Sequence, residues 1–329
     1  MNYRRAMLVL LLLSKLAAHV QAQPDRVMYV TFYQAPVSIA AARAVPTYQG
    51  LAVSTDRGQT WENRGWSTSA VSNIAISDRD NSSLFLATDY GVLRGSEHGI
   101  SLKLVSDQDM PPVLGIACVH GSVWAATSAG LFVSTDSGER WIARHSNLPA
   151  PNGSYVTGVL SLANSLLIST ADGLFRSTDQ GRSWVRSGLD GEEIHRVFTH
   201  PTRPEVLAAI SQQHGVWISE DGGWNWTQRN EGLRSTAVKT LAFNPDKQDE
   251  ILVGTRNVGL FRSTNLGKSW DITGGGLSNF NVTALHFDPD DANTVYAGTE
   301  NGTFISNNQG RSWQSFSVRL GYISAILIR

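Results

Sequence analysis

The stretch GLFRSTDQGRSW, residues 173–184, indicates the fold of the chain, because similar stretches recur along the whole sequence. A divergent copy at residues 91–102 has Glu97 in the aspartate position and Leu102 in the tryptophan position. The serine position falls every 39 to 44 residues, at 54, 95, 134, 177, 219, 263 and 306. A repeat this regular predicts an architecture of seven similar units. The other, closer copies are residues 50–61, 130–141, 215–226, 259–270 and 302–313.

Each copy reads as two short strands joined by a turn. An apolar run leads into Ser-x-Asp-x-Gly-x-x-Trp, and a second short run follows. The Asp or Asn side chain can accept N–H groups of its own turn, Gly allows a positive φ, and Trp packs on the hairpin. We therefore interpret the acidic or amide residue and the tryptophan of the six full copies as structural. These residues are Asp56, Trp61, Asp136, Trp141, Asp179, Trp184, Asp221, Trp226, Asn265, Trp270, Asn308 and Trp313.

The pattern Ser-x-Asp-x-Gly-x-x-Trp resembles the Asp-box, or bacterial neuraminidase (BNR) repeat. That repeat is found in sialidases, xyloglucan-type glycoside hydrolases, sortilin-type receptors and photosystem II assembly/stability factors. The resemblance covers almost the whole chain after residue 22 and implies a β-propeller. It implies no single activity, because enzymes and non-enzymes share the box.

Two further apolar runs lie between successive boxes. The clearest case is residues 238–243, a proline turn at 244–246, and residues 251–255, followed by the box hairpin. Four short strands in each period of about 40–45 residues are typical of a propeller blade. The sequence thus predicts an all-β, seven-bladed propeller with four antiparallel strands per blade.

The two ends of the chain complete one another. Residues 322–329 (YISAILIR) read as the first strand of a blade, and residues 27–33 (VMYVTFY) read as a second strand that lacks a first. We therefore expect the C-terminal strand to join the first blade and close the ring. Deleting residues 320–329 should then destabilise the whole domain.

The first 22 residues read as an export signal, with Arg4 and Arg5 before an apolar core at 6–13. This predicts a propeller domain at residues 23–329 in the periplasm or outside the cell. The apolar run is shorter than the ~20 residues that span a bilayer, so we expect no stable membrane insertion. Cys118 is the only cysteine, which excludes an internal disulfide.

The charge of the chain argues against nucleic acid as a partner. Residues 1–22 contain three of the 27 basic residues and none of the 28 acidic ones, which leaves a net charge of −4. The sequence has no basic run of the kind that neutralises phosphates. It also lacks metal-ligand spacing and a phosphate loop, so we expect no metal and no cofactor.

Strands of a blade alternate in direction, so links between second and third strands, and between fourth and first strands, share one face. The resembling families carry their ligand chemistry on that face, around the central channel. We predict a protein or glycan partner there and a monomeric protein. The link at residues 34–49 is longer than its counterparts and is either a binding feature or a plain surface loop. The candidate binding residues on this face are Asp89, Tyr90, Asp172, His214, Arg234, Arg256, Asn257, Glu300 and Asn301.

The sequence favours a non-catalytic binding or assembly scaffold, a layout similar to the photosystem II assembly factors. Sialidase chemistry needs three arginines around a carboxylate, and the early Phe/Tyr-Arg-Ile-Pro motif of that family is absent. The rival hypothesis is a glycoside hydrolase, with Asp89 and Glu300 as acid and base. A lectin-like binder is a third, if Tyr90, Phe280 and Trp66 cluster on one face. The arginines expected on that face are Arg43, Arg196, Arg234 and Arg256.

Overall fold

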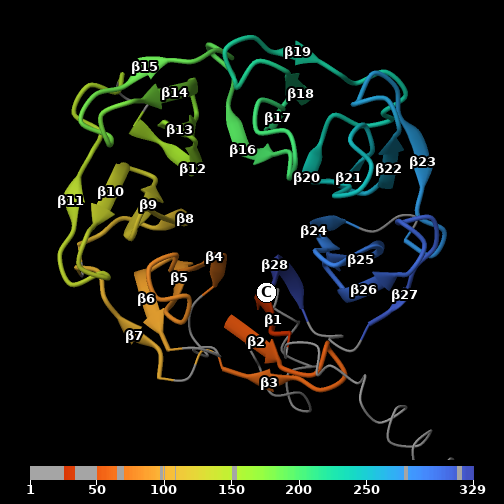
Figure 1. Ribbon diagram of the computed structural model, residues 1–329, viewed down its shortest axis with the longest axis horizontal. Coiled ribbons are helices and arrows are strands. Elements are labelled where there is room, and N and C mark those ends of the chain that lie inside the picture. The colour runs from red at the N-terminus through yellow and green to blue at the C-terminus, as the bar shows by residue number, and fades with distance from the viewer. Residues whose placement is uncertain are drawn as a thin grey trace, which may run out of the picture.

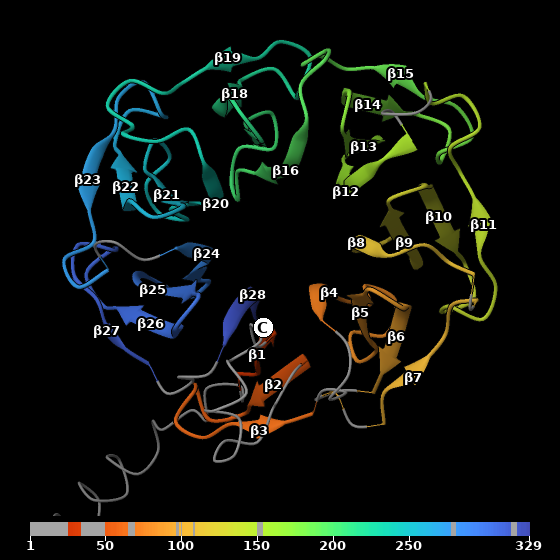
Figure 2. The same ribbon diagram turned by 180° about the vertical axis from the view of Figure 1, so that it is seen from behind.

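The computed structural model describes residues 26–33, 50–64, 70–96, 99, 101–107, 109–149, 154–277, 281–316 and 321–329. These residues form seven four-stranded antiparallel sheets arranged as a ring around a central axis (Figures 1 and 2). The predicted seven-bladed, all-β propeller is confirmed. The predictions for the signal segment 1–22, the link 34–49, Arg43, Trp66 and Phe280 lie outside the described residues.

Each blade has an innermost, a second, a third and an outer strand, and blades are numbered from the N-terminus. The innermost strands of blades 1 to 7 are β28 (Tyr322–Ile328), β4 (Val71–Ile76), β8 (Val113–Val119), β12 (Val156–Leu162), β16 (Ile194–Thr199), β20 (Val238–Phe243) and β24 (Val282–Asp288). The second strands are β1 (Met28–Tyr33), β5 (Leu84–Thr88), β9 (Ser122–Thr127), β13 (Ser165–Thr170), β17 (Leu207–Ser211), β21 (Ile251–Thr255) and β25 (Asp291–Thr299).

The third strands carry the apolar start of each repeat, and the outer strands follow the turn. The third strands are β2 (Gly50–Ser54), β6 (Gly91–Gly95), β10 (Gly130–Ser134), β14 (Gly173–Ser177), β18 (Gly215–Ser219), β22 (Gly259–Ser263) and β26 (Gly302–Ser306). The outer strands are β3 (Glu62–Asn63), β7 (Lys103–Leu104), β11 (Ile142–Ala143), β15 (Val185–Arg186), β19 (Thr227–Gln228), β23 (Asp271–Thr273) and β27 (Gln314–Ser315).

The C-terminal strand closes the ring, as predicted. β28 pairs antiparallel with β1, with Met28 opposite Ile328 and Thr31 opposite Ala325. Arg26, just before β1, forms a largely buried ion pair with Asp288 at the end of β24. The strand pairing thus completes blade 1, and the charge pair joins blade 1 to blade 7.

The hydrophobic core lies between neighbouring blades. Seven clusters of buried side chains occupy the seven junctions. At the junction of blades 1 and 2, for example, Tyr29 and Leu51 pack with Leu86 and Leu93. Because each sheet contributes both faces to this core, the second strands are almost wholly buried, as in Leu84–Thr88.

The repeated box is held by its own hydrogen bonds. In the first box the N–H of Gly58 donates to Ser54 Oγ over 2.7 Å, and the N–H of Thr60 donates to Asp56 Oδ1 over 2.8 Å. Amides serve equally well, since Asn265 Oδ1 accepts the N–H of Ser269 at 2.9 Å. Gly58 has φ +80°, a conformation that glycine adopts at low cost.

The box tryptophans do more than pack on their own hairpins. The indole N–H of Trp184 donates to the carbonyl oxygen of Arg144 over 2.7 Å, and that of Trp270 donates to Arg229 over 2.9 Å. Both acceptors directly follow the outer strand of the preceding blade. Trp184 and Trp270 therefore tie consecutive blades together at the outer rim, a role that the repeat alone did not predict.

Candidate binding site in the central channel

Every innermost strand carries a β-bulge near its start, at the second residue in blades 2 to 7 and at the third residue in blade 1. The bulged residues in blade order are Ser324, Ser72, Leu114, Thr157, His195, Lys239 and Thr283. A bulge places one extra residue against its partner strand and re-aims the side chain. The seven bulges therefore form a ring at the end of the channel where the innermost strands begin.

Four of the bulged residues join neighbouring blades through a side-chain hydroxyl group. Ser72 Oγ donates to the carbonyl oxygen of Val113 over 2.8 Å, and Thr157 Oγ1 donates to that of Ile194 over 2.6 Å. Thr283 and Ser324 do the same toward Ile323 and Val71. In each case the acceptor is at the start of the next blade's innermost strand. The hydroxyls thus hold together the channel ends of four junctions.

Blades 5 and 6 break this pattern with basic side chains, His195 and Lys239. Burial is the main cause that lowers the pKa of His195, and the charge of Lys239 lowers it further. Burial, and then the charge of Arg256, lower the pKa of Lys239. Within the described part of the chain, neither Lys239 nor the side chain of Arg256 has a hydrogen-bond or ion-pair partner. We call His195, Lys239 and Arg256 the basic rim.

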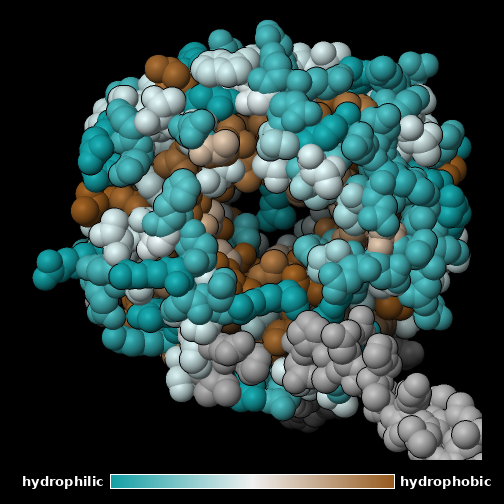
Figure 3. Space-filling model, in the orientation of Figure 1, coloured by the Kyte–Doolittle hydropathy of each residue, from teal (hydrophilic) through white to brown (hydrophobic). Residues whose placement is uncertain are grey.

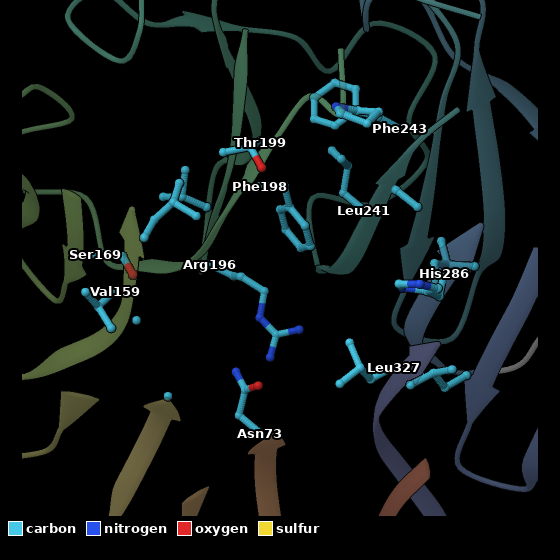
Figure 4. A pocket seen from close by; sticks show the side chains of 18 of the residues that line it. Asn73, Val159, Ser169, Arg196, Phe198, Thr199, Leu241, Phe243, His286 and Leu327 are labelled. Carbon is cyan, nitrogen blue, oxygen red and sulfur yellow. The ribbon is translucent and has the colours of Figure 1, made fainter. Parts of the chain in front are cut away.

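Arg196 follows the bulge of blade 5 and extends into the channel. Figure 4 shows its guanidinium pointing toward the amide of Asn73, which comes from β4 across the opening. Burial lowers the pKa of Arg196. No acidic side chain among the described residues pairs with it. The sequence had indicated Arg196 as one of the arginines of the face that carries the second-to-third links, and the structure places it on an innermost strand with its side chain in the channel.

The channel encloses a cavity of about 710 Å³ that is lined by residues of all seven innermost strands. Apolar groups such as Val159, Phe198 and Leu241 form most of its wall. It extends to Pro201 and Pro245, in links between first and second strands, on the face opposite the bulges. No Asp or Glu is among its described lining residues. Figure 3 shows the central opening with apolar residues around it.

None of the nine predicted binding residues lines this cavity. Asp172 is half-buried and forms an ion pair with Arg186, Nη2 to Oδ2 2.6 Å. His214 Nδ1 lies 2.8 Å from Glu192 Oε2. The remaining residues of the set are exposed on links: Asp89, Tyr90, Arg234, Arg256, Asn257, Glu300 and Asn301.

The structure connects two of these residues through a third. Asn281 accepts the N–H of Asn257 at 2.7 Å and donates its own amide to Glu300. This links the second-to-third connections of blades 6 and 7. Asp89 and Glu300, the pair considered for acid–base chemistry, are on blades 2 and 7, with blade 1 between them.

Sequence reasoning missed the bulged position, and with it His195 and Lys239. The signal was present: four of the seven equivalent positions hold Ser or Thr, and two hold a basic residue. The described residues contain no group of three His, Cys, Asp or Glu side chains placed to hold a metal ion. They also contain no helix that is long and apolar enough to cross a membrane.

Comparison with known proteins supports the fold. A family model described as sortilin, neurotensin receptor 3, matches residues 172–259. No curated protein matches the chain at a significant level. The match covers two complete boxes, residues 173–184 and 215–226, so the evidence for the whole ring comes from solved structures.

Three solved structures illustrate the range. A GH74 enzyme from Niastella koreensis is 18% identical with a TM-score of 0.60, over 74% of this chain and 46% of that one. YCF48 bound to a D1 peptide is 19% identical with a TM-score of 0.57, over 85% of both chains. The extracellular domain of BT4673 from B. thetaiotaomicron is 16% identical with a TM-score of 0.63, over 79% of this chain and 36% of that one.

The protein is a seven-bladed β-propeller. Its structural neighbours include both YCF48 and GH74 propellers. The chain spans less than half the length of the GH74 and BT4673 structures. At these identities the likeness establishes the fold and leaves activity open.

Proposed function

We propose that the protein is an exported, non-catalytic binding module that holds an acidic segment of a partner protein, as an assembly factor does. The observation that carries this proposal is the basic rim. His195, Lys239 and Arg256 share one end of the channel on two neighbouring blades, within electrostatic reach of one another.

The charge of the rim is poorly balanced. The lowered pKa of His195 favours its neutral form, so the positive charge of the rim comes from Lys239 and Arg256, and the charge of Arg256 acts on Lys239. Like charges held together without counter-ions are costly, and an acidic partner offsets that cost. The chain as a whole is mildly acidic, so the rim is a local exception that favours one orientation of approach.

A hydrolase is supported less well. Glycoside hydrolysis uses two carboxyl groups about 5–9 Å apart. The channel cavity has no carboxylate among its described lining residues, and Asp172 and Glu192 are engaged by Arg186 and His214. The solved complex of YCF48 with a peptide demonstrates that a propeller of similar fold binds a polypeptide. Export is supported by the N-terminal signal pattern and by the extracellular BT4673 neighbour.

The test uses a fluorescent peptide rich in Asp and Glu with the full chain. We expect binding that weakens with salt, and the double variant Lys239→Glu/Arg256→Glu should bind on the order of tenfold more weakly. Lys103→Glu, on the outer strand of blade 2, is the matched control and should bind as the native protein does. Equal peptide binding by the double variant and the native protein would refute the role of the basic rim in binding.

Two enzyme assays run beside the binding test, with xyloglucan oligosaccharides and with a sialyl-lactose substrate. We expect no turnover of either. Hydrolysis that persists after repurification would instead support a glycoside hydrolase. Saturable sugar binding without turnover would support a lectin-like binder.

A further inference from the structure

The geometry points to a second site, inside the channel, that binds a small carboxylate with an unbranched apolar body. This inference is independent of the basic rim and of any protein partner. Its head-group anchor is Arg196, and its wall is the apolar cavity of about 710 Å³. Cavities of that size suit small organic ligands.

The anchor is distinctive among the equivalent positions of the seven blades. Arg196 directly follows the bulge of β16. The corresponding residue is a glycine in blades 3 and 4, Gly115 and Gly158. In the other blades this position holds short, uncharged side chains: Ala325, Asn73, Thr240 and Ala284. Arg196 is therefore the one cation at this position among the seven blades, and it lines the channel cavity.

A carboxylate is the group that fits this anchor. The guanidinium of Arg196 is half-buried, and such a group binds an anion with two oxygens in a fork. The amide of Asn73 faces the same point from across the channel (Figure 4) and can donate to the same group. No described acid occupies this place, so the anion has to come from a ligand. One arginine also matches a single charge better than the double charge of a phosphate.

The apolar body fits the rest of the cavity. From Arg196 toward the opposite face, the wall is formed by Val159, Leu160, Phe198, Leu241, Leu285 and Leu327. Few polar groups interrupt it, chiefly His286 and Thr199. Such a wall gains from each buried methylene and offers a sugar or a charged chain few partners.

The probe is decanoate, measured by isothermal titration with the full chain. We expect saturable binding of one decanoate, and affinity that rises from hexanoate to decanoate by up to about fourfold per methylene. Arg196→Gln should weaken decanoate at least about tenfold, which is the loss expected for a charged hydrogen-bonded pair. Decanol should bind the native protein as weakly as decanoate binds that variant.

The controls separate this site from the rim and from misfolding. Lys103→Gln, on the outer strand, should bind decanoate normally, and Arg196→Gln should keep the native circular dichroism spectrum and its affinity for the acidic peptide. No binding of decanoate by native protein, equal binding by Arg196→Gln, or decanol binding as tight as decanoate would each overturn the inference. If the rim variant Lys239→Glu/Arg256→Glu loses only peptide binding, the channel site for the carboxylate is still supported.

Discussion

Thr283 Oγ1 donates a hydrogen bond to the carbonyl oxygen of Ile323 over 2.5 Å, across the junction between blade 7 and the C-terminal strand. The same hydroxyl lies 3.1 Å from the carbonyl oxygen of Gly298, so it bridges three strands. Thr283 is 7% exposed, and water cannot readily replace it. This contact belongs to the ring of bulges and is the one closest to the closure of the propeller.

Replacing Thr283 by valine keeps the shape of the side chain and removes the hydroxyl. We expect a loss of about 1–3 kcal/mol in the free energy of unfolding, because buried carbonyl oxygens lose their donor. Urea denaturation followed by tryptophan fluorescence measures it. Thr227→Val, on the exposed outer strand β19, is the control and should change stability by less than about 0.5 kcal/mol.

Arg26 offers a second test, since it binds one buried and one exposed acid. The side chain of Asp288 is 12% exposed and that of Asp290 is 67% exposed. Asp288→Asn should destabilise the protein by about 2 kcal/mol, because a buried charged hydrogen bond loses its charge. Asp290→Asn should cost less than about 1 kcal/mol, since solvent screens that pair. Equal losses in the two variants would show that burial does not govern this junction.

The sequence predicted the architecture because its determinants are local. Ser, Asp, Gly and Trp recur in a fixed order along the chain. The residues of each box form the hydrogen bonds of their own turn, so the repeat alone indicates the number of blades. The closure was also readable, since residues 322–329 have the apolar pattern of a first strand. Even the positive φ of Gly58 followed from its place in the turn.

The residues that line the channel could not be predicted from the sequence in the same way. A bulge depends on the register between two strands and on the approach of the next blade, and apolar periodicity does not reveal either. Arg196 therefore looked like one more residue of a link or face. His195 and Lys239 become conspicuous only when aligned with Ser72 and Thr157 at the bulged position.

Acid should unfold the protein through its boxes. Hydrogen bonds, first from the Thr60 hydroxyl, lower the pKa of Asp56 from 3.8 to about 2. The pKa values of Asp136, Asp179 and Asp221 are lowered too. A lowered folded-state pKa stabilises the protein at pH above about 4, and this stabilisation is lost as the pH falls from about 4 to about 2.

Melting temperatures at pH 5, 4, 3 and 2 measure this dependence. The variant Asp56→Asn/Asp179→Asn should lose less stability over that range, because asparagine still accepts the turn N–H and does not titrate there. Asn265 already fills this role in blade 6. An unchanged pH slope in the double variant would move the acid sensitivity to other groups, such as Asp80, whose pKa is also lowered.

Cys118 should be chemically inert in the folded protein. Burial, with smaller effects from the charges of Asp78 and Asp80, raises the pKa of its thiol to about 12. The thiolate is the reactive form, so alkylation by iodoacetamide at pH 8 should be on the order of a hundredfold slower than in guanidinium-unfolded protein. Mass spectrometry of timed samples gives both rates. Comparable rates in the two states would contradict the burial of this thiol.

The pairing of β28 with β1 has a consequence for biosynthesis. β1 ends at Tyr33, and its inner neighbour begins only at Tyr322, so six blades emerge from the ribosome before the first can be completed. Such a distant pairing is slow to form. A chain interrupted before β28 would present an open strand to proteases and to other nascent chains, whereas a finished one would not. Covering the open edge of β1 therefore depends on the synthesis of β28.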